Sequence, residues 1–244
     1  MDRMKDSGSF DKGSIPFGRT SFSDTGRIAL VIFDFDGTLA DTQCAIVRTM
    51  QQTMSALHLP VLDAARCASV IGLELQDAFR ELFPQHGVPT AARCVDTYRR
   101  LFAENRKTLI PSWFPHVPQV LRWLHQCGCP AAIATSRSSV SLRQLLDDMD
   151  EVPPFRCLVG GDDVLHHKPD AEAVLRILAD TGTEAADTLV VGDAAVDILM
   201  GRAAGAHTCG VTYGNAGREK LMQAGAEHII DDISSLPELI HNIK

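Results

Sequence analysis

The sequence predicts an α/β protein in which a small all-helical cap domain is inserted into a doubly wound parallel sheet. Two observations lead to this prediction. An apolar run at residues 28–33 ends in Asp-Phe-Asp-Gly, which is typical of a buried parallel strand followed by a tight turn. No convincing strand pattern occurs between residues 43 and 110, whereas strand and helix patterns alternate further along the chain.

We divide the 244 residues into three regions. Residues 1–26 contain Ser, Gly, Asp and Lys without an apolar segment, so we expect a flexible tail and no secretory signal. Residues 27–42 and 116–244 are assigned to the α/β core, and residues 43–115 to the helical cap with its linker. Three prolines mark that linker, namely Pro111, Pro115 and Pro118.

The first expected strand, at residues 28–33, is followed by the cap helices. Apolar residues at helical spacing predict helices at residues 43–58, 62–69, 74–83 and 90–107. We expect Asp41 and Thr42 to cap the first of them. Substrate specificity is expected to come from the cap, with the loop around Gly72, Leu73 and Glu74 as the candidate.

The second part of the core is expected to alternate between helices and strands. The expected strands are residues 131–134, 157–159, 189–191, 207–211 and 228–230. The expected helices are one from Pro118 to Gly128, one at 138–149, one opened by Lys168-Pro169 and ended near Gly182, one ending at Ala204, and two at 217–224 and 236–242.

The composition excludes several classes of partner. With 23 basic and 31 acidic residues the net charge is −8, which argues against a nucleic-acid or anionic-membrane surface. No apolar stretch is long enough to span a membrane. Seven scattered cysteines without a Cys-x-x-Cys pair indicate reduced thiols in a cytoplasmic protein. An anionic substrate must therefore be attracted locally, by a metal or by a few cations.

Polar side chains follow the expected strands or lie in nearby loops. These residues are Asp34, Asp36, Thr135, Ser136, Lys168, Asp193 and Asp197. Each has a simpler interpretation, such as an Asp-Gly turn, a helix cap or a surface cation. Ligands of open α/β sheets bind at the carboxyl ends of the strands, so the set together predicts one acidic, phosphate-handling site.

The motifs Asp34-Phe-Asp-Gly-Thr38, Thr135, Lys168-Pro169 and Gly192-Asp-x-x-x-Asp197 resemble the four motifs of the haloacid dehalogenase superfamily. The resemblance covers roughly residues 28–236. It implies a Rossmann-like core with a small helical cap, and within the superfamily the chain is most similar to phosphoglycolate phosphatase and its relatives.

The residue types fit phosphoryl transfer. An anionic nucleophile can attack a phosphoryl group only beside a cation, and clustered carboxylates suit a hard divalent ion, with Mg²⁺ as the default. Asp34 is expected to attack phosphorus and form an aspartyl-phosphate. Asp36 is expected to protonate the leaving oxygen and then to activate water. Lys168 and Thr135 are expected to hold the phosphoryl oxygens.

The resemblance also implies how the metal and the phosphate are bound. The metal ligands are the side chains of Asp34 and Asp193 and the backbone carbonyl of Asp36. Asp197 orients Lys168 and acts on the metal through water. The phosphate is bound by further residues, namely Gly37, Thr38 and Ser136 through backbone amides, with Arg137 as an additional candidate cation.

The predicted function is therefore a magnesium-dependent phosphatase of a small phosphomonoester such as 2-phosphoglycolate, acting as a monomer or homodimer. A sugar phosphomutase of the same fold is the alternative. A receiver-type signalling domain or a non-catalytic phosphate-binding module is a more remote one. The adjacent His166 and His167 are interpreted as loop residues. The bulky segment 113–116 stands where we expect a smaller, glycine-containing linker, and it is expected to stiffen the movement of the cap or narrow the substrate entrance.

Overall fold

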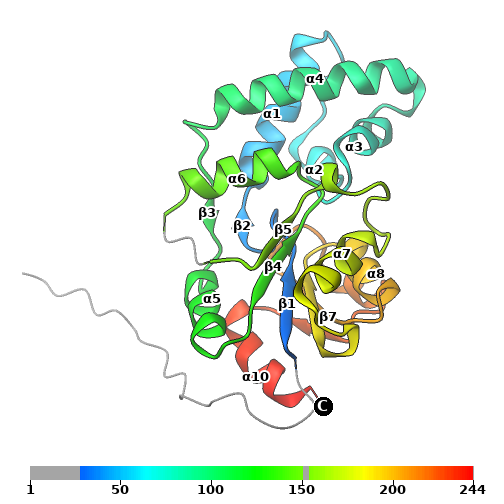
Figure 1. The fold of residues 1–244 in the computed structure, drawn as a ribbon. Helices are drawn as coiled ribbons and strands as arrows, with labels where there is room; N and C mark the ends of the chain where they lie inside the picture. Colours follow the sequence, from blue (N-terminus) through cyan, green and yellow to red (C-terminus); the bar gives the residue numbers. More distant parts are fainter. Residues whose placement is uncertain (1–27, 151–153, 244) are drawn as a thin grey trace, which may run out of the picture.

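The computed structural model describes residues 28–150 and 154–243, so the expected tail at 1–26 lies outside the described residues (Figure 1). Its core is a six-stranded parallel sheet with the strand order β5-β4-β1-β6-β7-β8. The strands are β1 Leu30–Phe33, β4 Ala131–Ala134, β5 Cys157–Val159, β6 Thr188–Gly192, β7 His207–Val211 and β8 His228–Ile230. The doubly wound sheet predicted from the sequence is confirmed.

The central strand β1 places the loops that carry polar residues next to one another. Phe33 pairs with Ile133 of β4 and with Val191 of β6. Because the strands run parallel in this register, the residues that follow them emerge at the same edge of the sheet.

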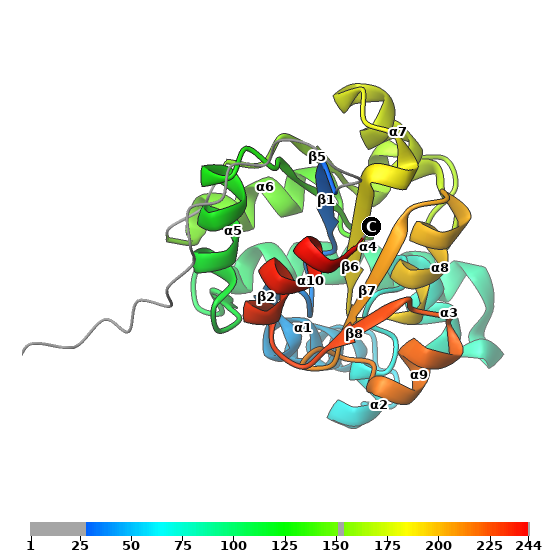
Figure 2. The same cartoon turned by 90° about the horizontal axis from the view of Figure 1, so that it is seen from below.

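Helices cover both faces of the sheet (Figure 2). Val31 and Phe33 of β1 belong to an apolar cluster that includes side chains of helices α5 Val117–Gln126, α6 Ser139–Asp148 and α10 Leu236–Asn242. Leu30 and Ile32 point to the other side, where they cluster with helices α7 Glu172–Thr181 and α8 Ala195–Ala203. Helix α9 Arg218–Gln223 packs on α8. Burial on both faces explains why β1 is a continuous apolar run.

The segment after β1 forms the expected helical cap, which lies over the carboxyl ends of the strands in Figure 1. Its helices are α1 Gln43–Ala56, α2 Ala64–Ala68, α3 Leu75–Leu82 and α4 Gly87–Asn105. Helix α4 begins three residues earlier than predicted and includes Pro89 in its first turn. A proline is tolerated there because the first amides of a helix have no partner within the helix.

The connection between cap and core contains a short sheet that the sequence analysis missed. Strands β2 Ala40–Asp41 and β3 Ser112–Trp113 pair antiparallel. They join the segment that enters the cap to the segment that leaves it. The ring of Trp113 packs edge-on against Phe35 at a centroid distance of 6.4 Å. The backbone N–H of Phe114 donates to the Leu39 carbonyl. The bulky linker is therefore fastened to the core.

Two local predictions were wrong. Thr42 precedes α1, but its side chain makes no capping hydrogen bond, because its backbone is already in the helical region (φ −101°, ψ −3°) instead of the extended conformation of most caps. Lys168-Pro169 does not open a helix, since α7 begins only at Glu172. The carboxylate of Glu172 accepts hydrogen bonds from the amides of Leu165 and His166 and so closes the preceding loop.

Candidate active site

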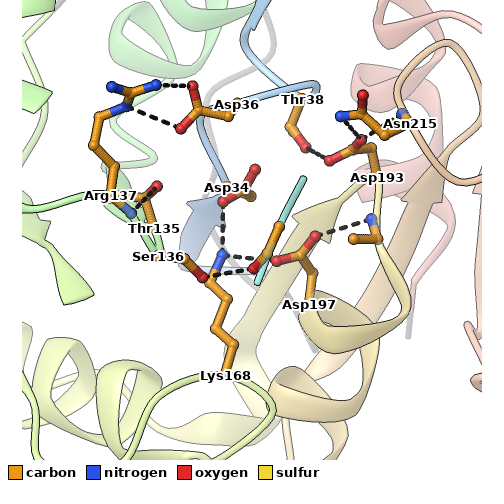
Figure 3. Close-up of polar contacts among 12 residues, drawn as sticks. Asp34, Asp36, Thr38, Thr135, Ser136, Arg137, Lys168, Asp193, Asp197 and Asn215 are labelled. Carbon is orange, nitrogen blue, oxygen red and sulfur yellow. Dashed lines mark hydrogen bonds and ion pairs between the residues drawn. The ribbon is translucent and has the colours of Figure 1, made fainter. Parts of the chain in front are cut away.

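The predicted acidic site forms at the carboxyl edge of the sheet, beneath the cap (Figure 3). Asp34 and Asp36 follow β1, Thr135 follows β4 and Asp193 follows β6. Lys168 reaches the same place from the loop before α7. The structure thus brings the principal residues of the sequence prediction together.

Lys168 lies at the centre of this arrangement. Its Nζ donates to Asp34 Oδ1 at 2.6 Å and to Asp197 Oδ1 at 2.7 Å, and only 3% of its side chain is exposed. Burial on its own lowers the pKa of Lys168, but the neighbouring carboxylates of Asp197 and Asp34 outweigh it and raise the pKa above its ordinary value. The lysine therefore stays charged and orients the carboxylate of Asp34.

Three buried carboxylates meet next to Lys168. Asp34, Asp193 and Asp197 each offer an oxygen within 4.8 Å of the other two. Burial raises the pKa of Asp34 well above its ordinary value, against the opposing effect of Lys168. Burial and the charge of Asp197 raise the pKa of Asp193 to about 6.

This carboxylate cluster fits a hard divalent cation. One lysine cannot compensate the charge of three buried carboxylates. The pKa values of Asp34 and Asp193 are raised by burial first and by the neighbouring carboxylates second. Oxygen ligands in a compact group are the set that Mg²⁺ prefers. Asp34 and Asp193 are the ligands expected from the sequence. Asp197 joins them in the cluster while it also binds Lys168 and the amide of Ala194.

Asp193 is held by a residue that the sequence analysis did not identify. Asn215 donates to Asp193 Oδ2 from its backbone amide at 2.6 Å and from Nδ2 at 2.9 Å. Thr38 Oγ1 donates to Asp193 Oδ1 at 3.2 Å. Because Asn215 follows shortly after strand β7, the strand-end rule that selected the other residues applies to it as well.

The backbone conformation and the surroundings of Gly37 both require a residue without a side chain. Its φ of +97° lies in the region that disfavours side chains. A Cβ there would stand 2.3 Å from Asn215 Nδ2 and 2.4 Å from Asp193 Oδ2. Gly37 therefore allows the first loop to pass close to the carboxylate cluster.

Asp36 faces away from Lys168, toward Arg137. Arg137 donates from Nε to Oδ2 at 3.0 Å and from Nη2 to Oδ1 at 2.5 Å. The guanidinium also donates to Ser141 Oγ and lies 4.8 Å above the ring of Phe102 in the cap. The binding of phosphate by Arg137, which the resemblance implies, stays a prediction. In this structure Arg137 binds and orients Asp36.

Thr135 and Ser136 lie side by side but have different partners. The buried Thr135 hydroxyl accepts a hydrogen bond from the Arg137 amide at 3.2 Å. Ser136 Oγ donates to the Gly72 carbonyl of the cap at 2.7 Å. Ser136 therefore joins the site to the cap loop expected to govern specificity.

A cavity of ≈ 470 Å³ opens between this site and the cap. Asp34, Asp36 and Thr135 line its lower side, and the loop Gly72–Glu74 lines part of its upper side. His167 also borders the cavity, and its buried Nδ1 has no hydrogen-bond partner. A ligand in this cavity can thus contact the candidate catalytic groups and the cap at the same time.

Comparisons with known proteins agree with this geometry. The family model of haloacid dehalogenase-like hydrolases matches residues 31–211. A protein of Dickeya dadantii named probable phosphatase IndB is 34% identical over 216 residues, which cover 87% of this chain and 93% of that protein. The phosphoglycolate phosphatase of Pectobacterium atrosepticum is 30% identical over 211 residues, covering 85% and 90%.

The fold has a similar counterpart among solved structures. The crystal structure of a predicted phosphatase from Clostridium acetobutylicum superimposes with a TM-score of 0.80 at 24% identity. It covers 88% of this chain and 99% of that one. Among the helices of the described residues, none has the length and apolar character needed to cross a membrane.

Proposed function

Because this chain belongs to the family of haloacid dehalogenase-like hydrolases and is a phosphatase of that family, we propose that it hydrolyses a phosphomonoester with the help of Mg²⁺ and through an aspartyl-phosphate on Asp34. The observation that carries this proposal is the pairing of Lys168 with Asp34 inside the carboxylate cluster. The pairing holds the Asp34 carboxylate next to the positive charge of Lys168, at the wall of the cavity. A carboxylate in this position can attack the phosphorus of a bound ester.

In the proposed first step, a carboxylate oxygen of Asp34 attacks phosphorus and the bond to the leaving oxygen breaks. Lys168 and the Thr135 hydroxyl hold the phosphoryl oxygens in position. Bound Mg²⁺ would be held by Asp34, Asp193 and the Asp36 carbonyl, and it would offset the negative charge of the carboxylates and the phosphoryl group. The backbone amides of further residues are assigned to the phosphate, namely Gly37, Thr38 and Ser136.

Asp36 moves the proton in both steps. It gives a proton to the leaving alkoxide and later takes one from the water that hydrolyses the aspartyl-phosphate. Both of its carboxylate oxygens are bound by Arg137 in this structure. One of these two oxygens must therefore leave Arg137 and turn to the leaving oxygen of the substrate. The other stays bound to Arg137, which keeps the carboxyl group in place.

The substrate is proposed to be a small phosphorylated metabolite. 2-Phosphoglycolate serves as the reference compound, because the name of the Pectobacterium relative specifies it. No observation on the described residues favours a phosphomutase over a phosphatase.

The test is a phosphate-release assay over a panel of small phosphomonoesters. We expect turnover with Mg²⁺, loss of activity in excess chelator and recovery when Mg²⁺ is added back. Radioactive phosphate from a labelled substrate should be trapped on Asp34 after rapid acid quenching, and Asp34→Asn should trap none. Full activity in chelator, or label on another residue, would show that the proposed mechanism is wrong.

A further inference from the structure

We propose that the cavity selects phosphomonoesters whose leaving group is bulky, uncharged and largely apolar, and that it disfavours a small anionic leaving group such as glycolate. This inference rests on the proposed function, since it concerns the leaving group of the same reaction. It is carried by three features of the cavity, namely its walls, its charges and its size.

The walls that face the catalytic loops are mostly apolar. The cap contributes side chains from α1, from the loop between α2 and α3, and from α4, and these include Ile46, Met50, Val70, Ile71, Leu73 and Phe102. Most of them are buried members of the main apolar cluster. A charged group placed against such walls loses hydration and gains no hydrogen bonds, whereas an apolar group gains by leaving water.

The charged side chains of the lining do not favour an anion. Arg137 is already paired with Asp36, and the remaining arginine of the lining is Arg99, which is exposed on α4. Two further carboxylates border the cavity, those of Glu74 and Asp162. They accept hydrogen bonds from backbone amides, which keeps them fixed in place. A carboxylate on the leaving group would therefore meet more negative than positive charge.

The size of the cavity points to the same class of substrate. Its volume of ≈ 470 Å³ lies in the range of about 300–1,000 Å³ that encloses drug-sized ligands. A phosphoryl group with a two-carbon leaving group would leave much of this space to water against apolar side chains. A larger apolar group would displace that water.

The first experiment compares ethyl phosphate with n-hexyl phosphate, two esters whose alcohols have similar acidity but different apolar length. Each methylene group buried in the cavity should raise the affinity for the ester about fourfold. We therefore expect kcat/KM for hexyl phosphate to exceed that for ethyl phosphate at least tenfold, and 2-phosphoglycolate to fall below hexyl phosphate. Equal values for the two alkyl esters, or a tenfold preference for 2-phosphoglycolate, would overturn the inference.

A variant tests which wall makes the selection. Leu73→Lys places a cation on the cap loop without touching the catalytic groups. The variant should lower the ratio of kcat/KM for hexyl phosphate to kcat/KM for ethyl phosphate about tenfold. It should raise the corresponding ratio of 2-phosphoglycolate to ethyl phosphate. Val61→Lys is the matched control, because Val61 is an exposed cap residue that does not line the cavity. If these kcat/KM ratios are the same in both variants and in the unmodified protein, the cap loop does not make the selection.

Binding separates this inference from the proposed function. Hexylphosphonate and ethylphosphonate cannot be hydrolysed, and calorimetry with the unmodified protein and Mg²⁺ measures their affinities directly. We expect hexylphosphonate to bind at least tenfold more tightly. Equal affinities would overturn the inference even if phosphomonoesters are hydrolysed. Conversely, the expected order of affinities in a protein that hydrolyses no phosphomonoester would support the inference and contradict the proposed function.

Discussion

At the scale of single residues, two aspartates only two positions apart have different surroundings. Asp34 is bound by Lys168 within the carboxylate cluster, whereas Asp36 is bound by Arg137 on the side of the cavity. The first environment suits an anionic nucleophile next to a cation. The second holds a carboxyl group where a leaving oxygen can reach it, so their roles are expected to separate on mutation.

The corresponding prediction compares Asp34→Asn with Asp36→Asn. Asp34→Asn removes the proposed nucleophile, so no substrate should be turned over through a phosphoenzyme. Asp36→Asn removes the proton carrier and should slow hydrolysis of an alkyl phosphate by about 10²–10⁴-fold. A substrate with a good leaving group, such as p-nitrophenyl phosphate, should partly restore phosphoryl transfer in Asp36→Asn only. Rescue of both variants to the same extent would show that the assignment is wrong.

A second residue-scale prediction concerns pH and metal. The pKa of Asp193 is raised from 3.8 to about 6 in the folded protein, so the folded state binds a proton more tightly than the unfolded state. The ionisation of Asp193 therefore lowers the stability of the metal-free protein as pH rises from about 4 to 6. Above about pH 6 the whole of this destabilisation is present. Added Mg²⁺ should raise Tm more at pH 7.5 than at pH 5.

Asp193→Asn provides the control for this prediction. The variant removes the titrating carboxyl group, which is also one proposed metal ligand, while it keeps a similar side-chain shape. Its metal-free Tm should change less between pH 4 and pH 6.5 than that of the unmodified protein, and Mg²⁺ should raise it less at pH 7.5. A Mg²⁺ effect that is the same at both pH values in the unmodified protein would contradict the expectation.

At the scale of secondary-structure elements, the sequence predicted the buried strands well but did not predict the pairing of the two short linker strands. The strand at 131–134 was predicted to the residue, because an apolar run between polar loops specifies a strand buried on both faces. The two-residue strands β2 and β3 are too short to leave such a pattern, and their pairing joins residues about 70 positions apart. Local spacing contains no information about that contact.

The same limit applies to the site. Asp34, Lys168 and Asp193 were identifiable because each belongs to a motif at the end of a strand or in a loop. The pairing of Arg137 with Asp36 was not, since it joins two loops 101 positions apart and depends on the register of β1 and β4. The sequence therefore identifies the candidate reacting groups and the pairing of Asp197 with Lys168. The contacts of Arg137 with Asp36 and of Asn215 with Asp193 become evident only in the structure.

Helix α1 provides an element-scale prediction with a built-in control. Thr42 Oγ1 is buried without a hydrogen-bond partner, so Thr42→Val removes an unsatisfied polar group and should leave Tm unchanged or raise it. Thr49 Oγ1 donates to the Ala45 carbonyl and accepts from Asn105 Nδ2 of α4. Thr49→Val should therefore lower the free energy of unfolding by about 1–3 kcal/mol. Thermal and urea unfolding of both variants checks the contrast, and a similar loss in each would contradict it.

At the scale of the whole molecule, the cap and the core are joined by several kinds of contact. Ser136 donates to the Gly72 carbonyl, and Arg106 at the end of α4 pairs with Asp148 of α6 at 2.5 Å. Apolar side chains of both parts also belong to one buried cluster. The cap thus covers one side of the cavity and shares a buried apolar cluster with the core.

The last prediction follows from the pairing of Asp41 with Ser112, which holds the two ends of the cap segment next to each other. A linker of a few Gly and Ser residues can therefore replace residues 43–110 and leave the six-stranded sheet intact. We expect cooperative unfolding at a lower Tm, because the shared apolar cluster becomes exposed. Since the cap supplies most of the apolar cavity wall, kcat/KM for ethyl and hexyl phosphate should become similar in the capless protein. A capless protein that unfolds cooperatively and still prefers hexyl phosphate tenfold would show that the selection resides in the core.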